Sequence, residues 1–209
     1  MIPVDAIVTF VIASAVLSIA PGPDNIFVLT QSAVYGKKVG ILVTLGLCSG
    51  LIVHTTAVAL GIAALFQSSV VAFTALKVVG ALYLLYLAWQ AFSVAEVSME
   101  REGVIHCSAG TLYRRGVLMN ITNPKVSLFF LAFLPQFASP QYGAIAPQIF
   151  LLGSIFMVVA LVIFSSIAVV SASLGGWLNR SSKAQLYLNR FAALIFAGLA
   201  LKLVTSSVS

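Results

Sequence analysis

The stretches Pro21-Gly22-Pro23-Asp24-Asn25 and Asn120-Ile121-Thr122-Asn123-Pro124-Lys125 decide how this chain folds. Both lie inside long apolar segments, and each brings proline and an ionisable side chain to a place where hydrocarbon is expected. Proline removes a backbone donor and clashes with the preceding helical turn, so each stretch predicts a broken helix. We therefore interpret the rest of the sequence in relation to two interrupted helices.

The composition places the chain in a membrane. Of its 209 residues, 61% are hydrophobic and only 8% are charged, and the mean hydropathy is +1.11. A soluble domain carries roughly 25% charged residues, because surface-to-volume scaling gives it a polar exterior. Apolar stretches of more than about 18 residues recur, as a membrane-crossing helix requires. We expect an all-α integral membrane protein whose first span is retained, because the N-terminus has Asp5 and lacks the basic region of a signal peptide.

Six spans account for the apolar segments. They are Val4–Val34 (interrupted at Pro21–Pro23), Val39–Phe66, Val70–Phe92, Gly116–Phe137, Ile145–Val170 and Leu186–Val204. A long charged connection, residues 94–115, divides this single transmembrane domain, residues 1–209, into halves of about 1–93 and 116–209. Three spans in each half make the halves enter the membrane in opposite directions, and aligning Pro23 with Pro124 brings the two breaks into register. This pattern predicts two inverted three-helix repeats with helices 1 and 4 broken, an architecture typical of secondary transporters.

The basic residues predict the orientation. The net charge of +6 comes from dispersed side chains that flank the spans, so we expect no nucleic-acid partner. The first, third and fifth connections and their flanks contain Lys37, Lys38, Arg101, Arg114, Arg115, Arg180, Lys183 and Arg190. The positive-inside rule places these connections in the cytoplasm and both termini outside. Lys202 is the one basic residue that does not fit.

Each break is expected to expose a helix start at membrane depth. Asn123 followed by Pro124 is typical of an N-cap and first helical residue, and Gly22 would let the chain turn sharply between Pro21 and Pro23. A restarted helix presents unpaired N–H groups and the positive end of its dipole. Such ends bind anions, including carboxylates. The alternative is a proline kink without a ligand, which is common in membrane helices.

Asp24 and Lys125 bring opposite charges to a similar depth. Lys125 lies ten residues after Arg115, or roughly 15 Å along a helix, and Asp24 lies thirteen residues before Lys37. Charge in a bilayer is costly, so an intramembrane Asp or Lys is by default a functional-site hypothesis. We expect the two side chains to pair across the interface between the halves. A purely structural ion pair is the alternative.

Asparagines accompany these charges. Asn25 and Asn123 can supply neutral hydrogen bonds, and Asn120 belongs to the same cluster. The candidate binding residues are therefore Pro21, Gly22, Pro23, Asp24, Asn25, Asn120, Asn123, Pro124 and Lys125. We expect no catalytic, cofactor or metal site, because Cys48 and Cys107 form no CxxC motif and no plausible ligand set with the two histidines.

Gly46, Gly50 and His54 follow one another at i+4 steps and share one helix face. Small residues on that face let another helix approach closely. His54 and Asp24 are candidates for a proton relay, because both can ionise within the membrane. A hydrogen-bonded packing histidine is an equally good interpretation of His54.

Several motifs resemble the LysE/RhtB family of amino-acid exporters, in the family's order and along most of the chain. They are Pro21-Gly22-Pro23-Asp24-Asn25, Gly36-Lys37-Lys38-Val39-Gly40, Lys77-Val78-Val79-Gly80-Ala81-Leu82-Tyr83-Leu84-Leu85-Tyr86-Leu87-Ala88-Trp89 and Asn120-Ile121-Thr122-Asn123-Pro124-Lys125. Ala88 departs from the family, which usually has glycine there. The resemblance implies a multi-pass protein of the bacterial inner membrane that exports amino acids or close derivatives, driven by the proton gradient.

This interpretation assigns roles to the charges. A zwitterion offers a carboxylate to Lys125 and the half-helix N-termini, and an ammonium group to Asp24. The runner-up is a cation (heavy-metal) exporter of the same superfamily, although one Asp, one Lys and few soft ligands suit a zwitterion better. A channel fits less well, and a membrane enzyme lacks the clustered catalytic groups it would need. The sequence does not select one amino acid, and it leaves the oligomeric state open, with a homo-oligomer among the candidates.

Overall fold

The computed structural model describes residues 2–20, 22–68, 70–93 and 108–173, together with positions 190, 193, 194, 197, 198, 200 and 201. Seven α-helices make up most of the described part, and short π- and 3-10 segments follow the sixth. Their bounds are α1 Val4–Ile19, α2 Pro23–Tyr35, α3 Lys37–Ser68, α4 Val70–Ser93, α5 Ala109–Ile121, α6 Pro124–Leu128, η1 (π) Phe129–Phe133, η2 (3-10) Leu134–Phe137, η3 (3-10) Pro140–Tyr142 and α7 Ile145–Ser173.

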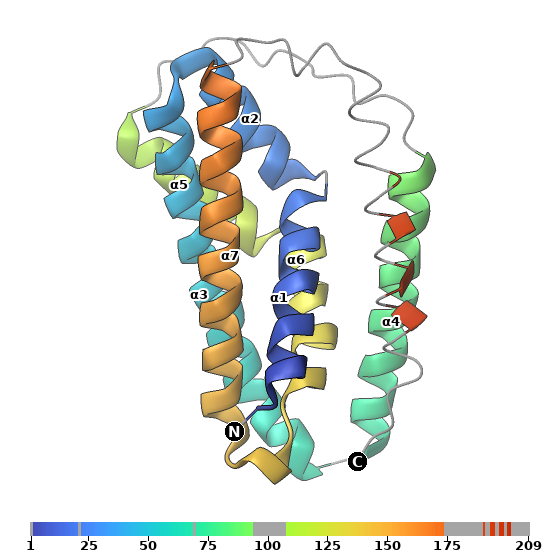
Figure 1. Ribbon diagram of the computed structural model, residues 1–209. Helices are drawn as coiled ribbons and strands as arrows, with labels where there is room; N and C mark the ends of the chain where they lie inside the picture. Colours follow the sequence, from blue (N-terminus) through green and yellow to red (C-terminus); the bar gives the residue numbers. More distant parts are fainter. Residues whose placement is uncertain are drawn as a thin grey trace.

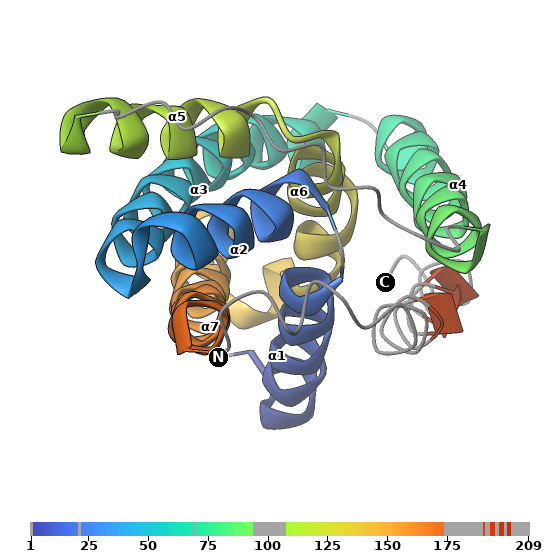
Figure 2. The ribbon, with the colours of Figure 1, turned by 90° about the horizontal axis from the view of Figure 1, so that it is seen from above.

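Helix α3 is the element around which the others pack. It follows α2 at Gly36, whose φ of 86° lies in the left-handed region that favours glycine. Both α5 and α7 pack along α3, while α1 and α2 pack against α7 (Figure 1). Helix α4 lies at the edge of the bundle, beyond α6, and contacts η1 (Figure 2).

Both predicted breaks are present. Helix α1 ends at Ile19 and α2 restarts at Pro23 with a bend of 58°, while α5 ends at Ile121 and the segment from Pro124 continues at 47° to it. The two broken segments run in opposite directions through the bundle, with α1 leading up to α2 and α5 leading down to α6 (Figure 1). The breaks therefore meet in the middle of the bundle rather than at its ends.

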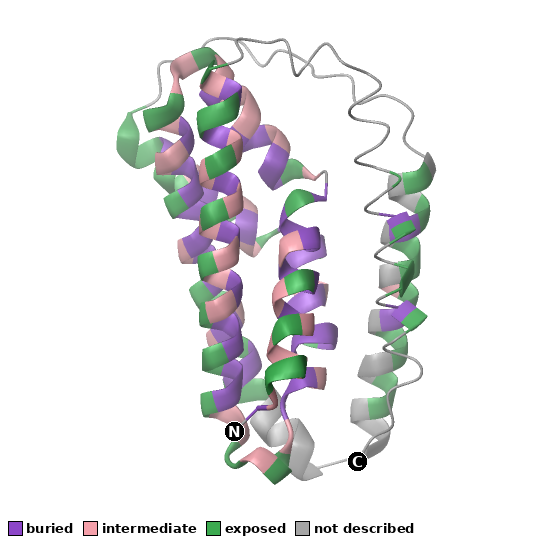
Figure 3. Ribbon diagram, viewed as in Figure 1, coloured by how far each residue is buried: buried purple, intermediate pink, exposed green. Residues whose placement is uncertain are grey.

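The bundle has an apolar exterior and buries several polar and charged side chains within a mostly hydrophobic core. Buried positions include Asp24, Asn120 and Lys125, whereas Leu60 on α3 and Val162 on α7 expose 68% and 61% of their surface. Figure 3 shows the buried residues on the inward faces of α3 and α7 and the exposed residues on their outward faces. A soluble protein reverses this distribution, because water solvates its surface. The apolar exterior identifies an integral membrane protein.

The described helices match most of the predicted spans. By length and composition, α7 and residues 37–61 of α3 can each cross a membrane, and each bent pair can form one more span, which makes up to four. Helix α4 coincides with the third predicted span. More than half of the sixth, Leu186–Val204, lies outside the described residues, as does most of the connection 94–115. The complete six-helix inverted repeat therefore stays a prediction.

The helix that contains the start of the fourth predicted span begins seven residues before Gly116. Helix α5 begins at Ala109, inside the expected charged connection, because Ser108 caps it and its Oγ accepts a hydrogen bond from the N–H of Thr111 at 3.3 Å. Within this helix the Arg115 guanidinium lies over the ring of Phe27, 5.2 Å from its centroid. A stacked arginine is compatible with a helix at the edge of the apolar region.

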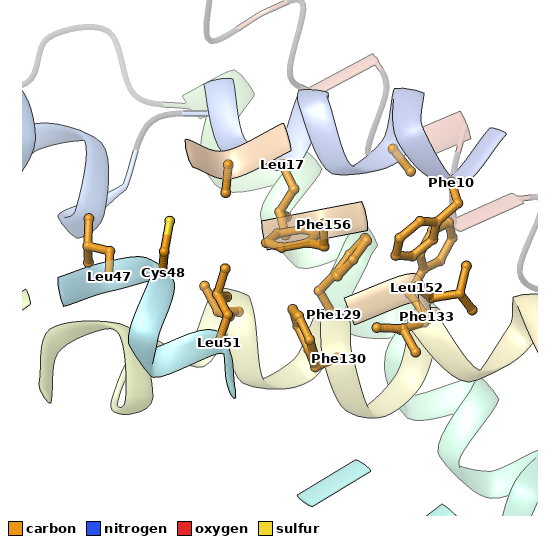
Figure 4. Close-up of a cluster of buried hydrophobic side chains, with 14 of the residues drawn as sticks. Phe10, Leu17, Leu47, Cys48, Leu51, Phe129, Phe130, Phe133, Leu152 and Phe156 are labelled. Atoms are coloured by element: carbon orange, nitrogen blue, oxygen red, sulfur yellow. The ribbon is translucent and has the colours of Figure 1, made fainter. Parts of the chain in front are cut away.

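An aromatic cluster fills the bundle beside the second break (Figure 4). Neighbouring ring centroids within it are 4.9–6.2 Å apart. Its members are Phe10, Phe129, Phe130, Phe133, Phe137 and Phe156. Three of them lie on the π-helix η1, which was not predicted from the sequence. The aromatic rings pack along one side of the two polar helix breaks. The site described next is therefore bordered on that side by apolar side chains.

Candidate functional site

The two helix restarts are built from the predicted residues. Asn123 is the N-cap of α6, and its Oδ1 accepts a hydrogen bond from the backbone N–H of Lys125 at 3.0 Å. Pro124 is the first residue of α6, and Pro23 is the first residue of α2. The predicted cap-then-proline pattern is therefore confirmed at the second break. Gly22 stands at the N-cap position of the first.

Gly22 has a different role from the one expected. Its φ of −179° and ψ of 176° are extended backbone that any residue can adopt, so no special turn requires glycine here. A Cβ at this position would instead lie 3.0 Å from Lys125 Nζ and 3.4 Å from its Cε. The lysine side chain packs directly on the glycine backbone. Glycine is needed for space rather than for conformation.

The Lys125 ammonium binds the end of α1. Its Nζ donates hydrogen bonds to the carbonyl oxygens of Leu17 at 3.1 Å and Ala20 at 2.9 Å. In a continuous helix, Leu17 would accept from the residue four positions on, but that residue is Pro21, which has no N–H. Pro21 itself lies outside the described residues. The proline thus leaves a carbonyl that the lysine satisfies.

Asn25 satisfies the neighbouring carbonyls in the same way. Its Nδ2 donates to the Ser18 oxygen at 2.6 Å and to the Ile19 oxygen at 3.4 Å. The helical partner of Ile19 would be Pro23, which again has no N–H. Two side chains, Asn25 and Lys125, therefore cap the last three carbonyls of α1 and the carbonyl of Ala20, which follows the helix.

Asp24 and Lys125 come to the same site, and each has other hydrogen-bond partners there. Lys125 Nζ donates to the α1 carbonyls, while Asp24 Oδ1 has no hydrogen-bond partner among the described residues. Asp24 is 1% exposed, and its Oδ2 accepts a hydrogen bond from Asn120 Nδ2 at 3.4 Å. The lysine charge still acts on the carboxylate electrostatically. The α1 carbonyls therefore hold the ammonium, while Asn120 holds the carboxylate.

Polar atoms without a hydrogen-bond partner in the protein gather at this site. They are Ser18 Oγ, Asp24 Oδ1, Asn25 Oδ1, Asn120 Oδ1 and Asn123 Nδ2, although the Asn123 side chain lies close enough to Asp24 to act on its carboxylate. All five residues are less than 8% exposed, and they come from α1, from α5 and from the two restarts. Buried polar groups are almost always hydrogen-bonded in native proteins, so such a cluster needs a physical reason. A polar ligand that binds between the breaks provides one.

The face of α3 that carries Gly46, Gly50 and His54 lies against α5, as the i+4 spacing predicted. A Cβ on Gly50 would lie 2.7 Å from Asn120 Oδ1, and a Cβ on Gly46 would lie 3.2 Å from the Cα of Gly116. His54 Nε2 lies 3.2 Å from the Asn120 carbonyl oxygen. The glycines let the backbone of α5 come close enough for Asn120 to reach Asp24.

His54 also borders the aromatic cluster, since its ring centroid is 5.6 Å from that of Phe130. It therefore joins the polar site to the rings. A chain of contacts leads from Asp24 through Asn120 to His54. This arrangement is compatible both with a proton relay and with a packing histidine.

The sequence had not indicated Ser18 or the carbonyls of Leu17 and Ala20. A signal was available for one of them, because a proline four residues after a helical residue always removes that residue's carbonyl partner. Nothing comparable marks Ser18. The structure brings together every predicted site residue that it describes, and it adds the end of α1 as a third component beside the two restarts.

Comparison with known proteins gives a consistent result. The profile of the LysE type translocators matches residues 15–207. A homoserine/homoserine lactone efflux protein of Salmonella typhimurium is 32% identical over 170 residues, which is 81% of this chain and 82% of that protein. An uncharacterized membrane protein of Vibrio cholerae is 29% identical over 94% of this chain and 95% of its own length. A leucine efflux protein of Salmonella choleraesuis is 27% identical over 94% of this chain and 93% of its own length. No solved structure matches the chain significantly.

Proposed function

The chain belongs to the LysE type translocator family and is a multi-pass protein of the bacterial inner membrane, and from this we propose that it exports amino acids or close derivatives in exchange for protons. The observation that carries this proposal is the cluster of buried, unpartnered polar atoms contributed by both helix breaks. A small polar solute bound there would be shielded from lipid on all sides.

The polar groups suit a zwitterion. Asp24 Oδ1, Asn25 Oδ1 and Asn120 Oδ1 are acceptors without partners, and they can receive the N–H groups of a substrate ammonium. Lys125 uses two of its three N–H groups on α1 carbonyls, which leaves one for a substrate carboxylate. The start of α2, directly beside Lys125, adds the positive end of a helix dipole. Opposite ends of the substrate thus find opposite charges.

The named relatives are compatible with this division. Homoserine and leucine each carry an ammonium and a carboxylate, whereas homoserine lactone keeps only the ammonium. If this chain accepts similar compounds, the ammonium is the group that they share. We therefore assign the recognition of the shared ammonium to Asp24 and the asparagine oxygens, and the binding of a carboxylate, where the substrate has one, to Lys125.

Transport follows from the position of the site between two halves that run in opposite directions. One half rocks against the other around the substrate and exposes it to each side in turn. Asp24 is the proposed proton carrier, because it is the buried carboxylate of the site. His54 is a candidate second member of the relay through Asn120.

Export assays test the proposal directly. Cells that overproduce the protein are loaded with individual amino acids, and efflux is followed with and without a protonophore. We expect lower intracellular levels of particular amino acids, protection from toxic analogues, and loss of both effects when the proton gradient collapses. Loaded vesicles that release no amino acid but move a divalent cation would favour the cation-exporter alternative.

A further inference from the structure

The Lys125 ammonium lies in a setting that usually holds a free cation. The side chain is 6% exposed, and its hydrogen-bond partners among the described residues are the carbonyl oxygens of Leu17 and Ala20. The Leu17 oxygen belongs to the last turn of α1, the negative end of that helix dipole, and Ala20 is the extended residue that directly follows the helix. Half-helix C-terminal ends and unwound carbonyls are the groups that coordinate coupling cations in transporters with broken helices.

We propose that the end of α1 is a monovalent-cation site matched to a primary ammonium, and that Lys125 is its tethered occupant. The chain then carries its own cation at the first break and needs no free Na⁺ there. This inference concerns the cation alone, so it does not depend on which solute the protein exports. It is compatible with the proposed function because the third N–H of Lys125 stays available to a substrate.

The local packing supports a site built for an ammonium. Gly22 has no conformational need for glycine, yet a Cβ there would lie 3.0 Å from Nζ. The backbone thus leaves room for the ammonium and its last methylene. Asn25 occupies the adjacent carbonyls of Ser18 and Ile19, so the cation is directed to Leu17 and Ala20. The carbonyl oxygens of Leu17 and Ala20 lie at the end of α1 and not on α6. They should therefore keep their positions if the Lys125 side chain were shortened.

Chemical rescue tests the proposal. The Lys125→Ala variant of the full chain removes the ammonium and most of the stem, and thermal unfolding is measured in detergent at increasing n-propylammonium chloride. We expect a saturable rise of the unfolding midpoint by a few degrees in Lys125→Ala, because a ligand that binds the folded state stabilises it. The wild type and the exposed-lysine control Lys38→Ala are expected to show no such rise.

Matched solutes identify what the site recognises. n-Propanol has the same length without the charge, and tetramethylammonium has the charge without N–H donors, so neither is expected to rescue Lys125→Ala. Lys125→Met fills the space with an uncharged chain and should not respond to propylammonium. Equal rescue by NaCl would overturn the preference for an ammonium. Absence of saturable rescue, or equal shifts in the wild type, would overturn the site itself.

The test remains decisive if Lys125→Ala is unstable. Propylammonium is then present from membrane extraction onward, and the unfolding midpoint is measured before and after its removal; a midpoint that does not fall contradicts the proposal. The wild type supplies a second measurement. Its amino-acid efflux should be unchanged when N-methylglucamine replaces Na⁺, and a requirement for Na⁺ would show that the lysine does not substitute for it. Failure of amino-acid efflux itself would concern the proposed function only.

Discussion

The Nζ of Lys125 lies 2.9 Å from the carbonyl oxygen of Ala20, although 105 residues separate them in the chain. This hydrogen bond joins the second helix break to the first. The two polar motifs therefore form one site rather than two independent kinks. A substitution in either motif should therefore alter the structure at the other.

Neutral variants of Asp24 and Lys125 distinguish a binding site from a structural pair. We expect Asp24→Asn to fold and lose efflux, and Lys125→Met to lose efflux and also unfold at a lower temperature, because it gives up two carbonyl contacts. The double variant should be as stable as Lys125→Met and inactive. Thermal unfolding in detergent and efflux from proteoliposomes check both quantities. Recovery of stability and efflux in the double variant would instead indicate a purely structural pair.

Gly50→Ala should damage the site through Asn120. The added Cβ would lie 2.7 Å from Asn120 Oδ1 and 2.8 Å from its Cβ, so the asparagine must move away from Asp24. Overpacking of this kind costs about 1–3 kcal/mol of stability. We expect the variant to remain folded and to lose most of its efflux. Gly61→Ala on the same helix is the control, because nothing lies within 4 Å of its Cβ position. Equal loss of efflux in both variants would refute the role of Asn120.

Two substitutions at Asn123 distinguish the role of its side-chain oxygen as a helix cap from the role of its side-chain NH₂ group. Asn123→Ala removes the hydrogen bond to the Lys125 N–H and should cost about 1 kcal/mol of stability. Asn123→Asp keeps a capping oxygen but loses Nδ2 and adds a carboxylate near Asp24. We expect Asn123→Asp to lose efflux and to unfold at a lower temperature at neutral pH, where two buried carboxylates repel each other, and to regain stability at lower pH, where one of them is protonated. An active Asn123→Asp variant would limit Asn123 to a structural cap.

His54→Gln tests the proton relay. Glutamine can retain a polar contact with the Asn120 carbonyl, but it cannot carry a proton. If His54 relays protons, the variant should lose efflux driven by a pH gradient and keep the exchange of internal for external substrate. Both rates are measured in the same proteoliposomes. Unchanged gradient-driven efflux would support the packing interpretation of His54.

Cysteine labelling tests the predicted orientation. After removal of Cys48 and Cys107, single cysteines replace Ser209 and Arg101. An impermeant maleimide should label position 209 from outside intact cells and position 101 only after permeabilisation, because the basic connections are expected in the cytoplasm. The reverse labelling pattern would invert the assigned orientation.

Local signals explain what the sequence could predict. Pro23, Pro124 and Asn123 act on their own backbone, so the two breaks and the cap at the second were predictable. The face of Gly46, Gly50 and His54 followed from helical spacing alone. These features need no knowledge of what lies opposite.

Features that depend on distant partners escaped prediction. The hydrogen-bond partners of Lys125 are orphan carbonyls at the end of another helix, which the charge of Asp24 did not indicate. Gly22 was assigned a turn because its role is visible only once Lys125 is placed on it. The early start of α5 depends on the Ser108 cap, and its Arg115 lies over the ring of Phe27, from the first half of the chain.

The π-helix Phe129–Phe133 affects how the two halves can be compared. A π turn contains an i→i+5 hydrogen bond, so it holds more residues than an α turn. The corresponding segment of the first half, Pro23–Tyr35, is regular α-helix. An alignment that matches Pro23 with Pro124 must therefore lose register within a few residues. Any ancestral duplication in this chain would be better recovered by superposing backbones than by comparing residues at a constant offset.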